Sequence, residues 1–154
     1  MEPRVAILIR NGEALLPEGL ERADIAIADG VVAAFDATPD SSLLRLDATG
    51  LLVLPGLVDC HGDAFERHIM PRPKVSFDID LALRDADRAL LASGITTAFH
   101  GVTWSWEPGL RSADNARALL AAIERLQPEL GADTRFHLRH ETFNLDAEPE
   151  ILDW

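Results

Sequence analysis

The strongest candidate for chemistry in this sequence is a histidine and a carboxylate two residues apart, His61 and Asp63, after the short strand-like segment 57–60. Side chains alternate along a strand, so the pair is expected on one face of a strand that contains both. An imidazole beside a carboxylate suits a divalent metal, Zn²⁺ or Mn²⁺. A polar strand end followed by an Asp turn is the alternative explanation, since two ligands do not complete a site.

A second group of ionisable side chains occupies alternate positions of a strand predicted over residues 135–141. One face of this strand carries Arg135, His137, Arg139 and Glu141, and the other carries Phe136, Leu138 and His140. The apolar face should pack against helices, so the polar face should point to the opposite side of the sheet, into the barrel. Charges on that face need partners or a metal if they are buried. Glu141 is therefore a candidate metal ligand at the strand's C-terminal end, and an ion pair with Arg139 is the alternative.

A basic cluster follows the His61 motif within a strongly acidic chain, whose net charge is −12. It contains Arg67, His68, Arg72 and Lys74, and Lys74 is the only lysine of the 154 residues. Prolines on both sides of Arg72 stiffen the loop. A guanidinium and an ammonium held in this way are good partners for phosphate oxygens. The alternative is a solvated loop whose bases pair with acids such as Glu66.

The elements that must position these residues divide the chain near Leu54. Residues 1–54 read as short strands over 5–10, 25–28, 31–35 and 51–54. Asn11-Gly12 is expected to end the first strand. Asp29-Gly30 predicts a two-residue hairpin between the second and third. This segment is interpreted as part of a small β-sandwich.

Residues 55–154 alternate between strands and helices. Strands are predicted over 57–60, 95–99 and 135–141. Asp78 is expected to cap the first long helix, which Gly94 ends, and Ser112 or Asp114 to cap the second. This alternation indicates an α/β fold with a parallel sheet. A closed (β/α)₈ barrel takes about 250 residues, so about 100 residues hold only its first three β/α units.

Composition narrows the classes of partner. The 47% apolar content is typical of a globular protein, and no uncharged apolar run is long enough to cross a bilayer. The acidic charge argues against nucleic acid and anionic membranes. The residues after Met1 do not resemble a secretion signal, so a cytoplasmic location is expected. The single cysteine, Cys60, excludes an internal disulfide and is expected to be buried.

The segment Leu-Pro-Gly-Leu-Val-Asp-x-His at 54–61, after a strand-rich prefix, resembles the amidohydrolase superfamily. There it is the first barrel strand with its metal motif. A closer resemblance is to the phosphonate-metabolism family of alpha-D-ribose 1-methylphosphonate 5-triphosphate diphosphatases. This likeness covers the chain from Leu51 onward. It includes the segments His61-x-Asp63, Pro71-Arg72-Pro73-Lys74-Val75, Ala92-Ser93-Gly94-Ile95-Thr96-Thr97 and His137-Leu138-Arg139-x-Glu141.

The resemblance implies a truncated TIM-type barrel and a metal-dependent hydrolase that is inactive as this short chain. One or two divalent ions, Zn²⁺ or Mn²⁺, would be held by His61, Asp63 and Glu141. Glu141 would replace the carbamylated lysine of many superfamily members, because no lysine occurs in that region. Arg72, Lys74, Arg139 and His68 would bind a small anionic phosphorylated sugar. The group that handles the water's proton is expected beyond residue 154.

Two other functions stay open at this point. The chain could come from another amidohydrolase branch, such as a cyclic amide hydrolase or a deaminase, although neutral rings do not need the basic cluster. It could also be a short non-catalytic protein that associates with itself, since a three-strand sheet exposes edges and an apolar face. His100, which is predicted to end the second barrel strand, could line the site or only cap the strand.

Overall fold

The computed structural model describes residues 6–36 and 44–154 and divides into two compact units, Met1–Pro55 and Gly56–Trp154. In the described part of the first unit, five strands form one mixed sheet. They are β1 (Ile7–Leu16), β2 (Gly19–Ala28), β3 (Val31–Phe35), β4 (Leu44–Asp47) and β5 (Leu52–Val53). The sheet order is β3-β2-β1-β4, and β5 also pairs with β1. Antiparallel pairing joins β1 to β2 and β2 to β3, whereas β4 and β5 run parallel to β1.

The predicted hairpin between β2 and β3 is confirmed. Ala28 pairs with Val31, so Asp29 and Gly30 form a two-residue turn. Their φ angles of 52° and 78° are the positive values that this tight turn requires. A small apolar cluster of Ala14, Ala23 and Ile25 forms the buried core of this sheet.

The expectation that Asn11-Gly12 ends the first strand is wrong. β1 continues to Leu16, and its pairing with β2 shifts register between Ile9 and Gly12. Asn11 takes a φ of 65° and its backbone N–H donates to the Asp24 carboxylate at 3.0 Å. The Asp24 side chain of β2 therefore accepts the hydrogen bond that the irregular backbone at Asn11 would otherwise lack. Asn11-Gly12 marks a β-bulge within the strand and not its end. Residue 5, the expected start of this strand, lies outside the described residues.

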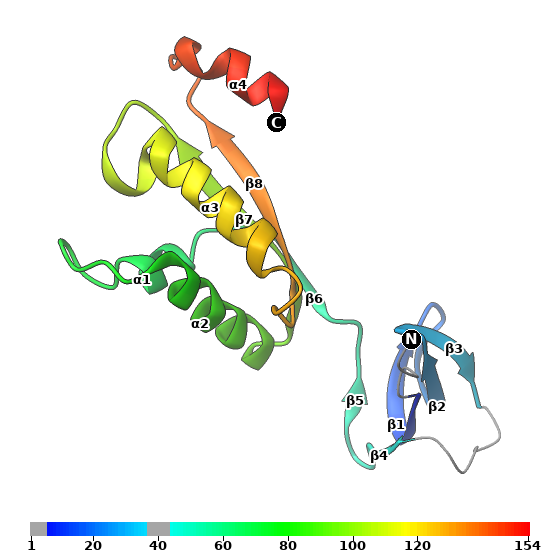
Figure 1. Ribbon diagram of the computed structural model, residues 1–154. Helices are drawn as coiled ribbons and strands as arrows, with labels where there is room; N and C mark the ends of the chain where they lie inside the picture. Colours follow the sequence, from blue (N-terminus) through cyan, green and yellow to red (C-terminus); the bar gives the residue numbers. More distant parts are fainter. Residues whose placement is uncertain (1–5, 37–43) are drawn as a thin grey trace. The chain divides into compact units, whose positions relative to one another are not determined.

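The second unit has the predicted alternation of strands and helices. Its sheet contains β6 (Leu57–Gly62), β7 (Ile95–Trp104) and β8 (Asp133–His140) in the order β6-β7-β8, all parallel. The helices α1 (Glu66–Ile69) and α2 (Ile79–Ala92) follow β6, and α3 (Ala113–Leu126) follows β7. A short α4 (Glu148–Asp153) follows β8. Figure 1 shows α2 and α3 side by side over the sheet.

The predicted helix boundaries are confirmed. The Asp78 side chain accepts from the backbone N–H groups of Asp80 and Leu81, at 3.1 and 3.2 Å, and so caps α2. Gly94 ends that helix region with a φ of 77°. Ser112, and not Asp114, caps α3 by accepting from the Asn115 N–H at 3.1 Å. Both helices therefore begin where a short polar side chain can satisfy the free N–H groups of the first turn.

The core of this unit lies between the helices and one face of the sheet. Its fully buried side chains include Leu83 of α2, Val102 of β7, and Leu119 and Leu126 of α3. β7 runs five residues further than the predicted 95–99, because residues Thr97 to Trp104 pair with β8. None of the helices formed by residues 6–36 and 44–154 is long and apolar enough to cross a membrane.

Asp87 of α2 links this helix by hydrogen bonds to the segment that precedes β8. Its side chain, in a residue 8% exposed, accepts from the backbone N–H groups of Gly131 and Ala132 at 3.1 and 2.8 Å. We expect Asp87→Ala to lower the free energy of unfolding by about 2–3 kcal/mol, since two amide donors lose their acceptor. Asp87→Asn keeps one acceptor oxygen and should cost less. Urea titration of the three proteins measures this, and equal stability of Asp87→Ala and the parent would contradict the role.

Candidate functional site

The predicted site residues lie at the C-terminal ends of the parallel strands. His61 is the penultimate residue of β6, Asp63 follows that strand, and Glu141 follows β8. In a parallel sheet all C-terminal ends meet at one edge, which is where α/β enzymes place their chemistry. The register separates these positions along the sheet, because Gly62 pairs with His100 of β7, whereas His140, which precedes Glu141, pairs with Trp104 four residues further on.

His61 of β6 and His137 of β8 form a close pair of ionisable side chains on this sheet. Their rings lie 4.7 Å apart at an interplanar angle of 74°, and the two Nδ1 atoms are 3.5 Å apart. The Nδ1 of His137 also lies 3.2 Å from the carbonyl oxygen of Cys60. The prediction that the polar face of β8 points away from the helices holds here, because His137 faces His61 while Phe136 and Leu138 pack against the core. The sequence reasoning placed His137 on this face but gave it no role.

Gly101 makes this contact possible. It pairs with His137 across β7 and β8, and it lies between β6 and β8 because β7 is the central strand. Two strands separated by a third are about 10 Å apart. A Cβ on Gly101 would lie 2.9 Å from Cε1 of His61, so the imidazole occupies the space that a side chain would need. The sequence carried a signal for this position, because Gly101 interrupts a strand made mostly of β-branched and aromatic residues.

The end of β6 is irregular. Pairing with β7 shifts register between Asp59 and Gly62, and the Asp59 carboxylate accepts from the His61 N–H at 3.2 Å. A Cβ on Gly62 would lie 2.2 Å from the same carboxylate. The regular alternation that was assumed for His61 and Asp63 is thus interrupted, and Asp63 itself lies outside the strand.

No group of three or more His, Cys, Asp or Glu side chains in residues 6–36 and 44–154 is arranged to hold a metal ion. Asp63 is exposed, and its carbonyl oxygen accepts from the Glu66 N–H at 3.0 Å. Glu141 donates its own N–H to the Trp104 carbonyl at 3.4 Å. The donor types fit Zn²⁺ or Mn²⁺, since imidazole nitrogen and carboxylate oxygen are their usual ligands. The set of His61, Asp63 and Glu141 stays a prediction.

Glu66 is a further acid at this edge that the sequence reasoning considered only as a partner for loop bases. It begins α1 and is half-buried. Burial raises the pKa of its carboxyl, and the nearby Asp63 raises it further, whereas Arg111 and Arg139 lower it. Asp63, Arg111 and Arg139 therefore all lie close enough to Glu66 for their charges to act on its carboxyl. The role of Arg139 in substrate binding stays a prediction.

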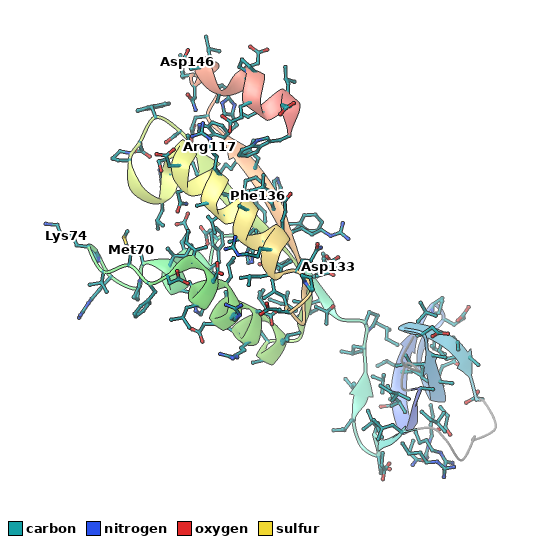
Figure 2. The ribbon with its side chains drawn as sticks, viewed as in Figure 1. Met70, Lys74, Arg117, Asp133, Phe136 and Asp146 are labelled. Carbon is teal, nitrogen blue, oxygen red and sulfur yellow. The ribbon has the colours of Figure 1, made fainter. Side chains whose placement is uncertain are left out.

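The basic loop forms an exposed turn. Arg72 and Val75 form a bridge, and Lys74 takes a φ of 66°. Within the described residues, neither Arg72 nor Lys74 forms an ion pair. Figure 2 shows Lys74 at the tip of a loop that projects away from the helices. His68 differs, because its Nδ1 lies 2.9 Å from the Asp85 carboxylate, so only its Nε2 is left for a substrate.

The open question about His100 is resolved by its burial. It is 4% exposed, on the helix-covered face of β7, where its ring lies 4.6 Å from that of Phe65. It therefore does not line the His61–His137 pair. The expectation that Cys60 is buried is wrong, since its side chain is exposed. β6 is an edge strand of the sheet, so fewer neighbours cover it.

No family model matches the chain. It is 29% identical over 138 residues to the alpha-D-ribose 1-methylphosphonate 5-triphosphate diphosphatase of Escherichia coli K12, covering 88% of this chain and 36% of that protein. It is 38% identical over 56 residues to an allantoinase of Desulfitobacterium hafniense Y51, covering 36% of this chain and 12% of the relative. Among solved structures, a D-hydantoinase superposes with a TM-score of 0.63 at 21% identity, over 97% of this chain and 31% of the other.

In its motif, in its match to the diphosphatase and in its fold, the chain is similar to proteins of the amidohydrolase superfamily. Its fold is that of β-sandwich strands followed by the first three β/α units of a TIM-type barrel. The particular relative that it matches over most of its residues is the diphosphatase named above. The chain spans about a third of the length of that relative and of the hydantoinase.

Because His100 is buried, it should make the folded protein less stable as the pH is lowered. Burial lowers the pKa of His100 from its ordinary 6.5 to about 4, although Asp59 opposes the shift. Between these pH values the unfolded chain binds more protons than the folded one, so the free energy of unfolding falls as the pH is lowered from about 6.5 to 4. The full loss is on the order of 3 kcal/mol.

We expect His100→Leu to remove most of this dependence, as measured by urea titration at several pH values between 4 and 7. His140→Leu is the control, because His140 lies on β8 and has no such buried position. Parallel stability curves for His100→Leu and the parent would contradict the assignment.

Proposed function

We propose that this chain is part of a metal-dependent hydrolase that cleaves alpha-D-ribose 1-methylphosphonate 5-triphosphate to the 5-phosphate and pyrophosphate. The observation that carries the proposal is the extent of the match to the Escherichia coli diphosphatase, which covers 88% of the chain. The allantoinase match from Desulfitobacterium hafniense Y51 covers 36%. The likeness to the diphosphatase therefore extends over both units and includes the basic loop.

The metal would be held by His61, Asp63 and Glu141. When bound, it lowers the pKa of a water molecule and polarises the phosphorus centre that the water attacks. The protein's contribution is to present an imidazole and carboxylates at one edge of a rigid parallel sheet. Half-buried Glu66, whose pKa is raised, adds an acid beside Asp63 that can hold a proton at this edge.

The substrate's triphosphate would be bound by Arg72, Lys74 and Arg139. Support comes from the free charges of the basic loop, since neither Arg72 nor Lys74 is paired within the described residues. Two prolines restrict the turn, which reduces the entropy lost on binding. A polyphosphate needs such cations, because most of the chain's charge is negative.

A second candidate is a cyclic amide hydrolase. It is favoured by the allantoinase matches, one of which covers 59% of the chain at 33% identity, and by the D-hydantoinase superposition over 97% of the chain. A neutral ring would leave Arg72 and Lys74 without a function in the reaction. The two candidates therefore differ in whether the basic loop contributes to catalysis.

A substrate assay separates the two. The product of the whole gene that encodes this chain, loaded with Zn²⁺ or Mn²⁺, should release pyrophosphate from the 5-triphosphorylated sugar and leave allantoin and hydantoin intact. Phosphate release with pyrophosphatase and ring opening by ultraviolet absorbance are the measurements. Ring opening without pyrophosphate release would establish the cyclic amide candidate, and turnover of neither would contradict both.

Loss of the loop cations should weaken substrate binding. We expect Arg72→Ala and Lys74→Ala each to raise KM for the triphosphate about tenfold or more, with a smaller effect on kcat, because a charge-assisted hydrogen bond contributes about 1.5–3 kcal/mol. Arg88→Ala is the matched control, since Arg88 is an exposed cation on α2 that forms no ion pair within the described part of the chain. Steady-state kinetics of the three variants test this, and equal KM values for loop and control variants would contradict it.

A further inference from the structure

We propose that His137 is a ligand of the same divalent metal as His61, and that Gly101 is the gap in the sheet that lets the two imidazoles meet. This inference rests on the proposed function only for the presence of a metal at His61. It adds a second imidazole, from the third strand of the sheet, to the ligands named above.

The separation of the two nitrogens is the first argument. Zn²⁺ binds histidine nitrogens at about 2.0–2.1 Å, so two nitrogens on one tetrahedral ion lie about 3.3–3.4 Å apart. The Nδ1 atoms of His61 and His137 are 3.5 Å apart before any ion is added. His61 is exposed and His137 is half-buried, so an ion from solvent can reach them.

The surroundings of the pair are the second argument. The Cys60 carbonyl oxygen, 3.2 Å from Nδ1 of His137, only accepts hydrogen bonds. In the metal-free protein it therefore favours the tautomer of His137 that carries hydrogen on Nδ1, because this N–H donates to the carbonyl and holds the ring toward β6. A metal at the two Nδ1 atoms leaves each neutral ring with its proton on Nε2, so the bound form differs in tautomer and not in charge.

The backbone at Gly101 is the third argument. Gly101 is not among the glycines with positive φ, so alanine can adopt its conformation. The obstacle to a side chain is the His61 ring, whose Cε1, Nδ1 and Nε2 atoms would lie 2.9–3.2 Å from the new Cβ. A ring at the end of a side chain can rotate away at little cost. The absence of a side chain at position 101 is thus needed for the imidazole contact and not for the fold.

Metal affinity tests the role of His137. Zn²⁺ binding by the purified chain is measured by competition with a chromophoric chelator, for the parent and for His61→Ala, His137→Ala and His140→Ala. We expect His137→Ala to weaken binding at least tenfold, in the direction of His61→Ala, and His140→Ala to change it less than twofold. His140 is the matched control, because it lies on the same strand and its Nε2 is bonded to the Asn144 carbonyl at 2.9 Å. Parental affinity in His137→Ala, or no Zn²⁺ binding by the parent, overturns the proposal.

A glycine substitution tests the geometry with both imidazoles present. The Gly101→Ala variant should fold with the circular dichroism of the parent and bind Zn²⁺ at least tenfold more weakly. In the parent, ¹⁵N spectra should show His137 change to the Nε2–H tautomer when Zn²⁺ is added. In Gly101→Ala this change should be absent. Gly131→Ala is the control, since its Cβ would also meet a flexible side-chain end, Leu91 Cδ1 at 2.6 Å, but away from the pair. Unchanged binding in Gly101→Ala overturns the proposal. Zn²⁺ binding through both histidines, together with a whole-gene product that hydrolyses no substrate, contradicts the proposed function alone.

Discussion

Parallel pairing of three strands under a single layer of helices is the constraint on which the second unit depends. β7 is hydrogen-bonded on both sides, and α2 and α3 cover one face of the sheet (Figure 1). The covered face takes most of the apolar side chains, so polar side chains of the same strands lie mainly on the other face or at the strand ends, with His100 as an exception. The candidate site is a consequence of this division, because His61 and His137 lie on the face that the helices leave open.

Charge is distributed unevenly around this site. The chain is strongly acidic, yet its loop after β6 carries cations that remain unpaired within the described residues. Asp63 and half-buried Glu66 lie near Arg139, and the competition between burial and these charges decides the direction of the Glu66 pKa shift.

Local sequence signals predicted much of the fold. Asp29-Gly30 specified its hairpin, and Asp78, Ser112 and Gly94 specified helix ends, because these residues act on the backbone within one turn. Asn11-Gly12 was misread, since the same residues that form a turn can form a bulge when a neighbouring strand supplies an acceptor such as Asp24. The buried position of His100 likewise depended on the length of β7, which pairing with β8 extends.

By itself, the sequence determined which residue types stand at the strand ends: His61 and Asp63 after one strand, and an alternating row with His137 and Arg139 on another. Periodicity of two was enough to separate the polar face of β8 from its apolar face. Only the tertiary structure decided that His61 meets His137, across 76 residues of sequence and over Gly101. That contact depends on strand order and register, which are set by packing between distant segments and leave no signal at the spacing of the two histidines.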